Sequence, residues 1–586
     1  MMAGLERSAG KSKRGVEANN RARLISVARG DEAPDLVVEG AQVFAAFTRE
    51  WLELDIAVAD GRVAGLGRFE GGERVDASGQ YLVPGFIDAH VHLESSMVTF
   101  DEFARCVLPC GTTTVVADPH EIANVLGVDG ILWMLEVCEG LPLEVYVMAP
   151  SCVPASAFES PRAPLTVADM ERILERDRAL GVGEMMNFPG VIAGEPAQLR
   201  KLALRGATHV DGHAPGVRGP RLDAYLAAGI QSDHESTTYE EALEKRRKGS
   251  WIFLREASNA HNLLDLLPLV LEHGTDLCAF CTDDRDPDDL LREGGINHMC
   301  RLAVEHGLAA EDALVLASIG AARAHGLREH GAIAPGYHAD FCLLPNLVEF
   351  RPSKVFKKGR LVAGDGQALP FLRSTVPGWV RSSMNAAAIR PEELAIRSDG
   401  DEVRVLGVIP GQIVTESLAM IPTTEHGFAV ADPARDLLKI CVIERHRATG
   451  RLGKGFVTGF GLKRGAFAST IAHDAHNAVV VGCSDADIVA CVERLRGIGG
   501  GLVVVADDQV LGELPLPIAG LLSDRPAREV VERLDHLHAI VADLGGKLEA
   551  PFMAQSFLAL SVIPALKITD RGLVDVERFA LVPLQT

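Results

Sequence analysis

The stretch VPGFIDAHVHLESS, residues 83–96, runs from an apolar segment directly into two histidines that are separated by one residue. Side chains alternate between the two faces of a β-strand, so His90 and His92 point to the same face and can bind one metal ion. The chain contains nineteen histidines, and two polar residues can also simply end a strand. The metal interpretation therefore depends on further ligands elsewhere in the chain.

The composition is that of a large globular protein with a small-molecule ligand. The chain has 586 residues, of which 47% are hydrophobic, and a net charge of −22. This acidic balance disfavours nucleic acid and anionic membranes as partners, because phosphate binding requires clustered Lys and Arg. Eleven scattered cysteines, no apolar signal segment and no long apolar run predict a cytoplasmic protein without disulfides or membrane spans.

The order of the segments predicts three folded parts. Strand-like and helical segments alternate over residues 84–327, a length close to the roughly 250 residues of a (β/α)8 TIM-like barrel. Short β-rich segments, 35–83 and 328–378, flank the barrel, and we expect them to pair into one small β-sandwich domain. The pattern over residues 379–586 predicts a C-terminal α/β domain, and we expect residues 1–34 to form an N-terminal extension.

Reactive groups of such a barrel lie at the C-terminal ends of its strands. Six of the eight expected strands end in groups suited to metal or proton chemistry: His90 and His92 on the first, Asp118, His120 and Glu121 on the second, Glu184 on the fourth, His213 on the fifth, His234 and Glu235 on the sixth, and Asp283 and Asp284 on the eighth. Imidazoles combined with carboxylates favour Zn, Fe or Mn over Ca or Mg.

The position of Glu184 predicts two divalent metal ions, because one carboxylate can bridge two cations about 3.5–4 Å apart. The expected ligands are His90, His92, Glu184, His213, His234 and Asp283. We expect Asp283 to bind the ion that is held by the first two histidines and also to accept a proton from water.

Several motifs together resemble a known family. The order of the histidine pair, the strand-four bridging residue, two single histidines and a final Asp is similar to that of the amidohydrolase superfamily. The segments PGFIDAHVHLESSM, DPHEIANVLG, GEMMN, DGHAPG, SDHES and FCTDDR narrow the resemblance to the bacterial adenine deaminases, as do residues 459–477 and 557–576 of the last domain. This resemblance implies hydrolysis of adenine to hypoxanthine and ammonia at a binuclear Mn, Fe or Zn centre, in purine salvage.

The chain departs from related deaminases at two points. Many superfamily members bridge their metals with a carboxylated lysine, where this chain has Glu184. Mononuclear deaminases place a Glu three residues after the strand-five histidine, where this chain has Gly216. Glu235 is therefore the expected proton donor to the purine ring nitrogen, although neighbours on a strand point apart and this directs it away from His234.

The expected mechanism assigns the remaining residues. Hydroxide attacks the carbon that bears the amino group, Glu235 protonates the ring nitrogen, and Asp283 passes a proton to the departing ammonia. Asp284 is expected to bind the imidazole side of the purine, and Asp118 and His120 are expected to lie around the substrate or just outside it.

Two other functions stay open at this point. The first is an amidohydrolase that acts on another cyclic amide or imine, because a fold does not determine a substrate. The second is a non-catalytic barrel that serves as an oligomeric scaffold, which would have no need of all six ligands. We also expect a homo-oligomer, and we expect the loop HDAHN, residues 473–477, to pack near the barrel mouth and exclude water.

Overall fold

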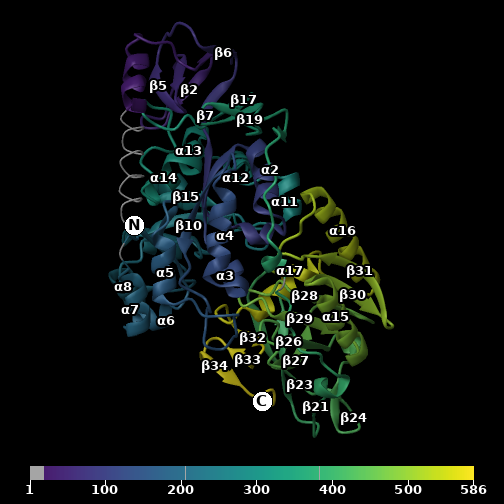
Figure 1. Cartoon of the computed structure of the whole chain (residues 1–586). Coiled ribbons are helices and arrows are strands. Elements are labelled where there is room, and N and C mark those ends of the chain that lie inside the picture. Colours follow the sequence, from purple (N-terminus) through teal and green to yellow (C-terminus); the bar gives the residue numbers. More distant parts are fainter. Residues whose placement is uncertain (1–18, 205, 382) are drawn as a thin grey trace, which may run out of the picture.

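A barrel of parallel strands lies at the centre of the computed structural model, which describes residues 19–204, 206–381 and 383–586 (Figure 1). One parallel sheet joins the neighbours in the order β12 (His209–Gly212), β11 (Ala179–Met185), β10 (Glu144–Ala149), β9 (Thr112–Ala117), β8 (Phe86–His92) and β16 (Asp283–Asp284). A second sheet joins β13 (Ser232–Asp233), β14 (Trp251–Arg255) and β15 (Cys278–Cys281). The predicted barrel is confirmed.

The barrel closes where β15 runs into β16. Asp88 of β8 accepts hydrogen bonds from the Thr282 backbone N at 3.0 Å and from its hydroxyl at 2.5 Å. This contact brings Asp283 into register with Val91 of the first strand. Burial raises the pKa of Asp88 to about 6, and its hydrogen bonds oppose that rise.

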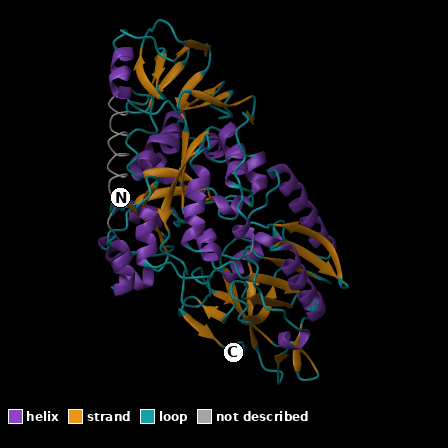
Figure 2. Ribbon diagram, viewed as in Figure 1, coloured by secondary structure: helices purple, strands orange, loops and turns teal. Residues whose placement is uncertain are grey.

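Helices surround the barrel strands (Figure 2). The strands are buried along nearly their whole length, as expected for parallel strands that are covered on both sides. The covering helices are α2 (Phe100–Val107), α3 (His120–Leu126), α4 (Val128–Cys138), α5 (Val167–Leu174), α6 (Phe188–Ile192), α7 (Pro196–Leu202), α8 (Gly219–Ala227), α9 (Tyr239–Arg247), α10 (Leu263–His273), α11 (Pro287–Arg292), α12 (Ile296–Glu305), α13 (Ala310–Val315) and α14 (Ala321–Ala324).

The two segments that flank the barrel in sequence form one small β domain, as predicted. Its first sheet has the order β5 (Arg62–Leu66), β4 (Ile56–Ala59), β1 (Leu36–Glu39), β6 (Glu73–Asp76). The second has the order β20 (Gln367–Ala368), β19 (Arg360–Gly364), β18 (Lys354–Lys357), β17 (Phe341–Leu344), β7 (Tyr81–Pro84), β2 (Gln42–Ala45), β3 (Glu50–Glu53). The segments meet where β7 pairs antiparallel with β17, Val83 opposite Cys342.

The C-terminal part contains a mixed sheet with helices on it. The strand order is β23 (Thr415–Met420), β22 (Val403–Val408), β27 (Leu452–Thr458), β26 (Leu438–Ile443), β29 (Ala478–Gly482), β28 (Ala466–Ser469), β30 (Gly501–Ala506), β31 (Gln509–Pro515). Helices α15 (Asp485–Ile498) and α16 (Ala527–Asp543) pack on this sheet. A small sheet of β32 (Leu566–Thr569), β33 (Gly572–Asp575) and β34 (Ala580–Val582) follows.

The expected N-terminal extension lies only partly within the described residues. Residues 19–28 are helical, and residues 1–18 lie outside the described part of the chain. Among the helices that the structure describes, none combines the length and the apolar character that crossing a membrane requires.

A buried charge cluster stabilises the side of the barrel next to β13. The Lys245 ammonium of α9 lies 2.8 Å from Asp233 and 2.7 Å from Glu241, and it donates to the Ala214 carbonyl at 2.8 Å. We expect Lys245→Met to lower the free energy of unfolding by about 3–5 kcal/mol, because two buried carboxylates lose their cation. Denaturant unfolding of the variant measures this loss.

The matched control is Lys248→Met on the same helix. Lys248 pairs with Asp223 and Glu244 near the surface, where an ion pair contributes at most about 1 kcal/mol. Equal losses of stability in the two variants would contradict the assignment.

Candidate metal centre

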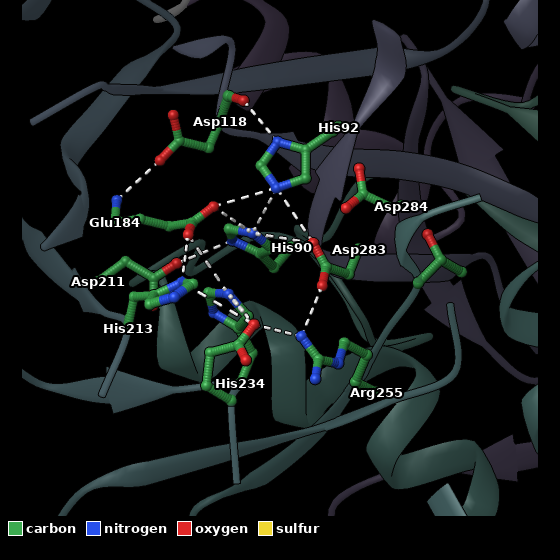
Figure 3. Close-up of polar contacts among 12 residues, drawn as sticks. His90, His92, Asp118, Glu184, Asp211, His213, His234, Arg255, Asp283 and Asp284 are labelled. Carbon is green, nitrogen blue, oxygen red and sulfur yellow. Dashed lines mark hydrogen bonds and ion pairs between the residues drawn. The ribbon is translucent and has the colours of Figure 1, made fainter. Parts of the chain in front are cut away.

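The two histidines of β8 converge with Glu184 of β11. The Nε2 atoms of His90 and His92 are 3.2 Å apart, and each lies 3.0 Å from Glu184 Oε1 (Figure 3). The three side chains are almost completely buried. Strand alternation predicted that the two imidazoles would share a face, and the geometry shows them directed at one point.

A second group of donors lies on the other side of the same carboxylate. Glu184 Oε2 is 2.8 Å from His213 Nδ1 and 3.6 Å from His234 Nε2. These three residues have donor atoms within 4.8 Å of one another, as do His90, His92 and Glu184. Glu184 therefore belongs to both groups, which is the arrangement of a bridging ligand.

The sixth expected ligand, Asp283, joins the first group. Its Oδ1 lies 3.0 Å from His92 Nε2 and 3.8 Å from His90 Nε2. Its Oδ2 accepts a hydrogen bond from Arg255 at 2.9 Å, and the same guanidinium contacts Glu235. Arg255 of β14 thus connects the two carboxylates to which proton transfer was assigned.

Two aspartates orient these ligands from behind. Asp211 Oδ2 accepts a hydrogen bond from His90 Nδ1 at 2.9 Å, and Asp118 accepts one from the Glu184 backbone N at 2.7 Å. The Asp118 carbonyl accepts from His92 Nδ1 at 2.9 Å. Such outer contacts determine which ring nitrogen is free to bind a metal.

The ligand atoms favour a positive charge among them. Carboxylate and carbonyl oxygens only accept, so the Nδ1 atoms of His90 and His92 carry protons. Burial would lower the pKa values of both imidazoles, but the neighbouring carboxylates hold them well above the usual value. Burial would raise the pKa of Glu184, but the surrounding histidines hold it well below its usual value. This donor set fits divalent metal ions of the Zn, Fe or Mn type.

A cavity opens over the ligands. Most of the residues that line it belong to the barrel, and most of these are polar: His92, His120, Glu121, Glu184, Met186, His213, Glu235, Arg255, Asn259, Ala260, Asp283 and Asp284. The C-terminal domain contributes Ile413, His473, Asp474, Phe557, Leu560 and Ile563. A polar floor beside an apolar wall is the usual lining of a small-molecule site, and it suits a flat heterocycle.

The structure gathers most of the predicted site residues in this cavity. Glu235 lines the cavity, and its Oε1 lies 3.8 Å from His213 Nδ1. Asp284 also lines the cavity and accepts a hydrogen bond from Ser95. Burial and the neighbouring Asp283 raise the pKa of Asp284. Asp118 is not among the lining residues, since its carboxylate faces the Glu184 backbone.

Sequence reasoning missed two residues of the site. Asp211 lies two residues before His213 in the motif DGHAPG, and Arg255 ends the seventh strand in WIFLREAS. Arg255 ends its strand, but a guanidinium neither binds a metal nor transfers protons at neutral pH, so a search for such groups passes over it. The role of Asp211 follows from its contact with His90, which is distant in sequence, so no local pattern indicates it.

A barrel in which strand-end histidines converge on one carboxylate is typical of the metal-dependent hydrolases of the amidohydrolase class. The model of the amidohydrolase family matches residues 81–362, and that of the adenine deaminase C-terminal domain matches residues 412–580. The chain belongs to the adenine deaminase family.

The similar proteins cover nearly the whole chain. Adenine deaminase 2 of Carboxydothermus hydrogenoformans is 50% identical, over 96% of this chain and 99% of that protein. The adenine deaminase of Archaeoglobus fulgidus is 47% identical, over 96% and 98%. Among solved structures, the β-aspartyl dipeptidase of Fervidobacterium islandicum has a TM-score of 0.44 at 20% identity, over 58% of this chain and 99% of that chain.

The hydrogen bond from His90 to Asp211 provides a test of the metal centre. We expect Asp211→Asn to lower the affinity for Mn²⁺ at the group that contains His90 about 10- to 100-fold, because this imidazole loses the group that orients it. Calorimetric titration of the metal-free protein with Mn²⁺ measures this change. Asp223→Asn, at an exposed helix position, is the control, and unchanged metal affinity in Asp211→Asn would refute the orienting role.

Proposed function

We propose that the protein hydrolyses adenine to hypoxanthine and ammonia in the cavity above the six predicted ligands. The proposal is carried by full-length similarity to proteins named adenine deaminase, including one at 50% identity. The cavity agrees with it, because imidazole and carboxylate ligands lie beside buried acids and an apolar wall. The substrate is a small purine base.

We assign two divalent cations to the two donor groups that share Glu184. His90, His92 and Asp283 would hold one, and His213 and His234 the other. When bound, such ions activate water as a nucleophile at neutral pH by lowering its pKa from 15.7 to about 7. Mn, Fe and Zn all suit these ligands.

The chain's own residues move the protons. Asp283 takes the proton that water gives up and returns it to the departing amino group, which leaves as ammonia. Glu235 protonates the purine ring nitrogen next to the reacting carbon, and it regains a proton from the hydroxyl on that carbon as the carbonyl of hypoxanthine forms. Arg255 contacts both carboxylates and so holds them in place at the cavity wall. Asp118 is a positioning residue that fixes the backbone at Glu184.

We further propose that the protein works in the cytoplasm, in purine salvage, as a homo-oligomer. Its eleven cysteines all lie in the described residues as free thiols, which suits a reducing compartment. Light scattering after size-exclusion chromatography gives the number of chains per particle.

The reaction is tested on protein purified with added Mn²⁺. We expect two metal equivalents per chain, ammonia release from adenine but not from adenosine, and no ring opening of dihydroorotate. A chelator should abolish the activity, and Mn²⁺ should restore it. Protein without bound metal would favour the scaffold, and metal-loaded protein that is inert toward adenine would favour a different amidohydrolase.

Three substitutions test the assigned roles. Glu235→Gln should keep both metals and lose at least about 100-fold in kcat, because a proton donor is removed. Glu184→Gln and Asp283→Asn should lose activity together with bound metal. Glu244→Gln, on the barrel surface, is the control. Near-normal adenine turnover by all three variants would refute the mechanism.

A further inference from the structure

The C-terminal domain forms one wall of the cavity. Among the residues that the structure describes, six side chains of this domain line it: Ile413, His473, Asp474, Phe557, Leu560 and Ile563. Two hydrogen bonds hold the domain against a loop of the barrel. The Thr569 hydroxyl donates to the Phe158 carbonyl at 2.5 Å, and the Asn477 side-chain amide donates to the Ser160 carbonyl at 3.2 Å. The wall therefore has a defined position relative to the metal ligands.

The loop that carries Asp474 is held on both sides. The His473 ring stacks on Phe557 with centroids 4.4 Å apart, and its Nδ1 lies 2.6 Å from Glu121 of the barrel. The Lys567 ammonium donates to the carbonyls of Ile413 at 2.7 Å and Phe557 at 3.0 Å, which connects the apolar part of the wall. A side chain on this loop can thus act as a fixed recognition group.

Asp474 lines the cavity and has an unused acceptor. The residue is 2% exposed, and its Oδ1 lies 3.7 Å from His120 Nε2. Its Oδ2 is buried and has no hydrogen-bond partner among the described residues. A buried carboxylate oxygen without a donor is costly, and an N–H group of a ligand bound in the cavity would supply that donor.

The position of Asp474 indicates which edge of a purine it meets. His120 lies on the Oε1 side of Glu184, with Nδ1 at 3.8 Å. Glu235 lies beside His213 and His234, which are on the Oε2 side. A flat purine whose ring nitrogen N1 faces Glu235 therefore turns its five-membered ring toward His120 and Asp474. That ring carries one N–H in a free base and none in an N9-substituted purine.

We propose that Asp474 accepts a hydrogen bond from the imidazole N–H of the purine and thereby selects free bases over N9-substituted purines such as nucleosides. This inference rests on the proposed function, because it places N1 at Glu235. Asp284 is the other cavity carboxylate expected at this edge, but its Oδ1 already accepts a hydrogen bond from Ser95. One of its oxygens also lies within 4.8 Å of possible metal-binding atoms of His92 and Asp283. Asp474 Oδ2, by contrast, accepts no hydrogen bond from the described residues.

The test compares adenine with 9-methyladenine, which lacks the imidazole N–H. We measure kcat/KM for both compounds on the Mn-loaded full chain. The wild type should prefer adenine, and Asp474→Ala should lower kcat/KM for adenine about 10- to 100-fold, through KM, while 9-methyladenine reacts as well as before or better. Asp474→Asn keeps an acceptor oxygen and should retain part of the preference.

Asp436→Asn is the matched control, because Asp436 accepts backbone hydrogen bonds from Gly459 and Gly461 in the same domain but does not line the cavity. It should behave like the wild type. Equal losses for both compounds in Asp474→Ala, or an unchanged ratio, would overturn the proposal. So would collapse of the preference in Asp284→Asn but not in Asp474→Ala.

Binding separates this inference from the proposed function. If the wild type binds adenine without releasing ammonia, the proposed function fails. The ratio of the dissociation constants for adenine and 9-methyladenine, measured by calorimetry on the wild type and Asp474→Ala, then decides on Asp474. A ratio that falls in the variant supports the proposal, and a ratio that stays the same refutes it.

Discussion

The carboxylate of Glu184, placed between two pairs of imidazoles, is the interaction on which the site depends. Four histidines, two from β8 and one each from the ends of β12 and β13, come together because each carboxylate oxygen faces one pair. The residue before it has to be small, since a Cβ on Gly183 would lie 2.2 Å from Asp118 Oδ2. Glycine thus lets Asp118 reach the backbone of Glu184.

The acidic character of the cavity is balanced by cations that the protein supplies itself. Arg255 lies between Glu235 and Asp283. Burial would lower the pKa of His473, but the carboxylates of Glu121 and Asp284 raise it to about 9, so its ring is positively charged at neutral pH. The C-terminal domain therefore contributes positive charge to a site whose ligands come from the barrel.

Local patterns predicted the parts of the site that depend on strand geometry. Alternation along β8 places His90 and His92 on one face, and the barrel rule collects Glu184, His213 and Asp283 at the same end. Contacts between distant segments leave no such signal. Nothing near Glu121 indicates that its partner is His473, and the motif around Asp118 does not reveal that its side chain faces the Glu184 backbone. Those facts depend on how the C-terminal domain docks and on how neighbouring strands stagger.

The pairing of β7 with β17 has a consequence for biosynthesis. Val83 lies opposite Cys342, so the small β domain contains the chain on both sides of the barrel. The ribosome releases the first half of this domain long before the second. Until then, apolar strands such as β1 and β4 lack the residues of the second half that complete their hydrophobic core. The nascent chain thus has an unpaired sheet edge until synthesis has passed the barrel. Loop closure over such a distance is slow, and this favours folding of the barrel before the small domain is complete.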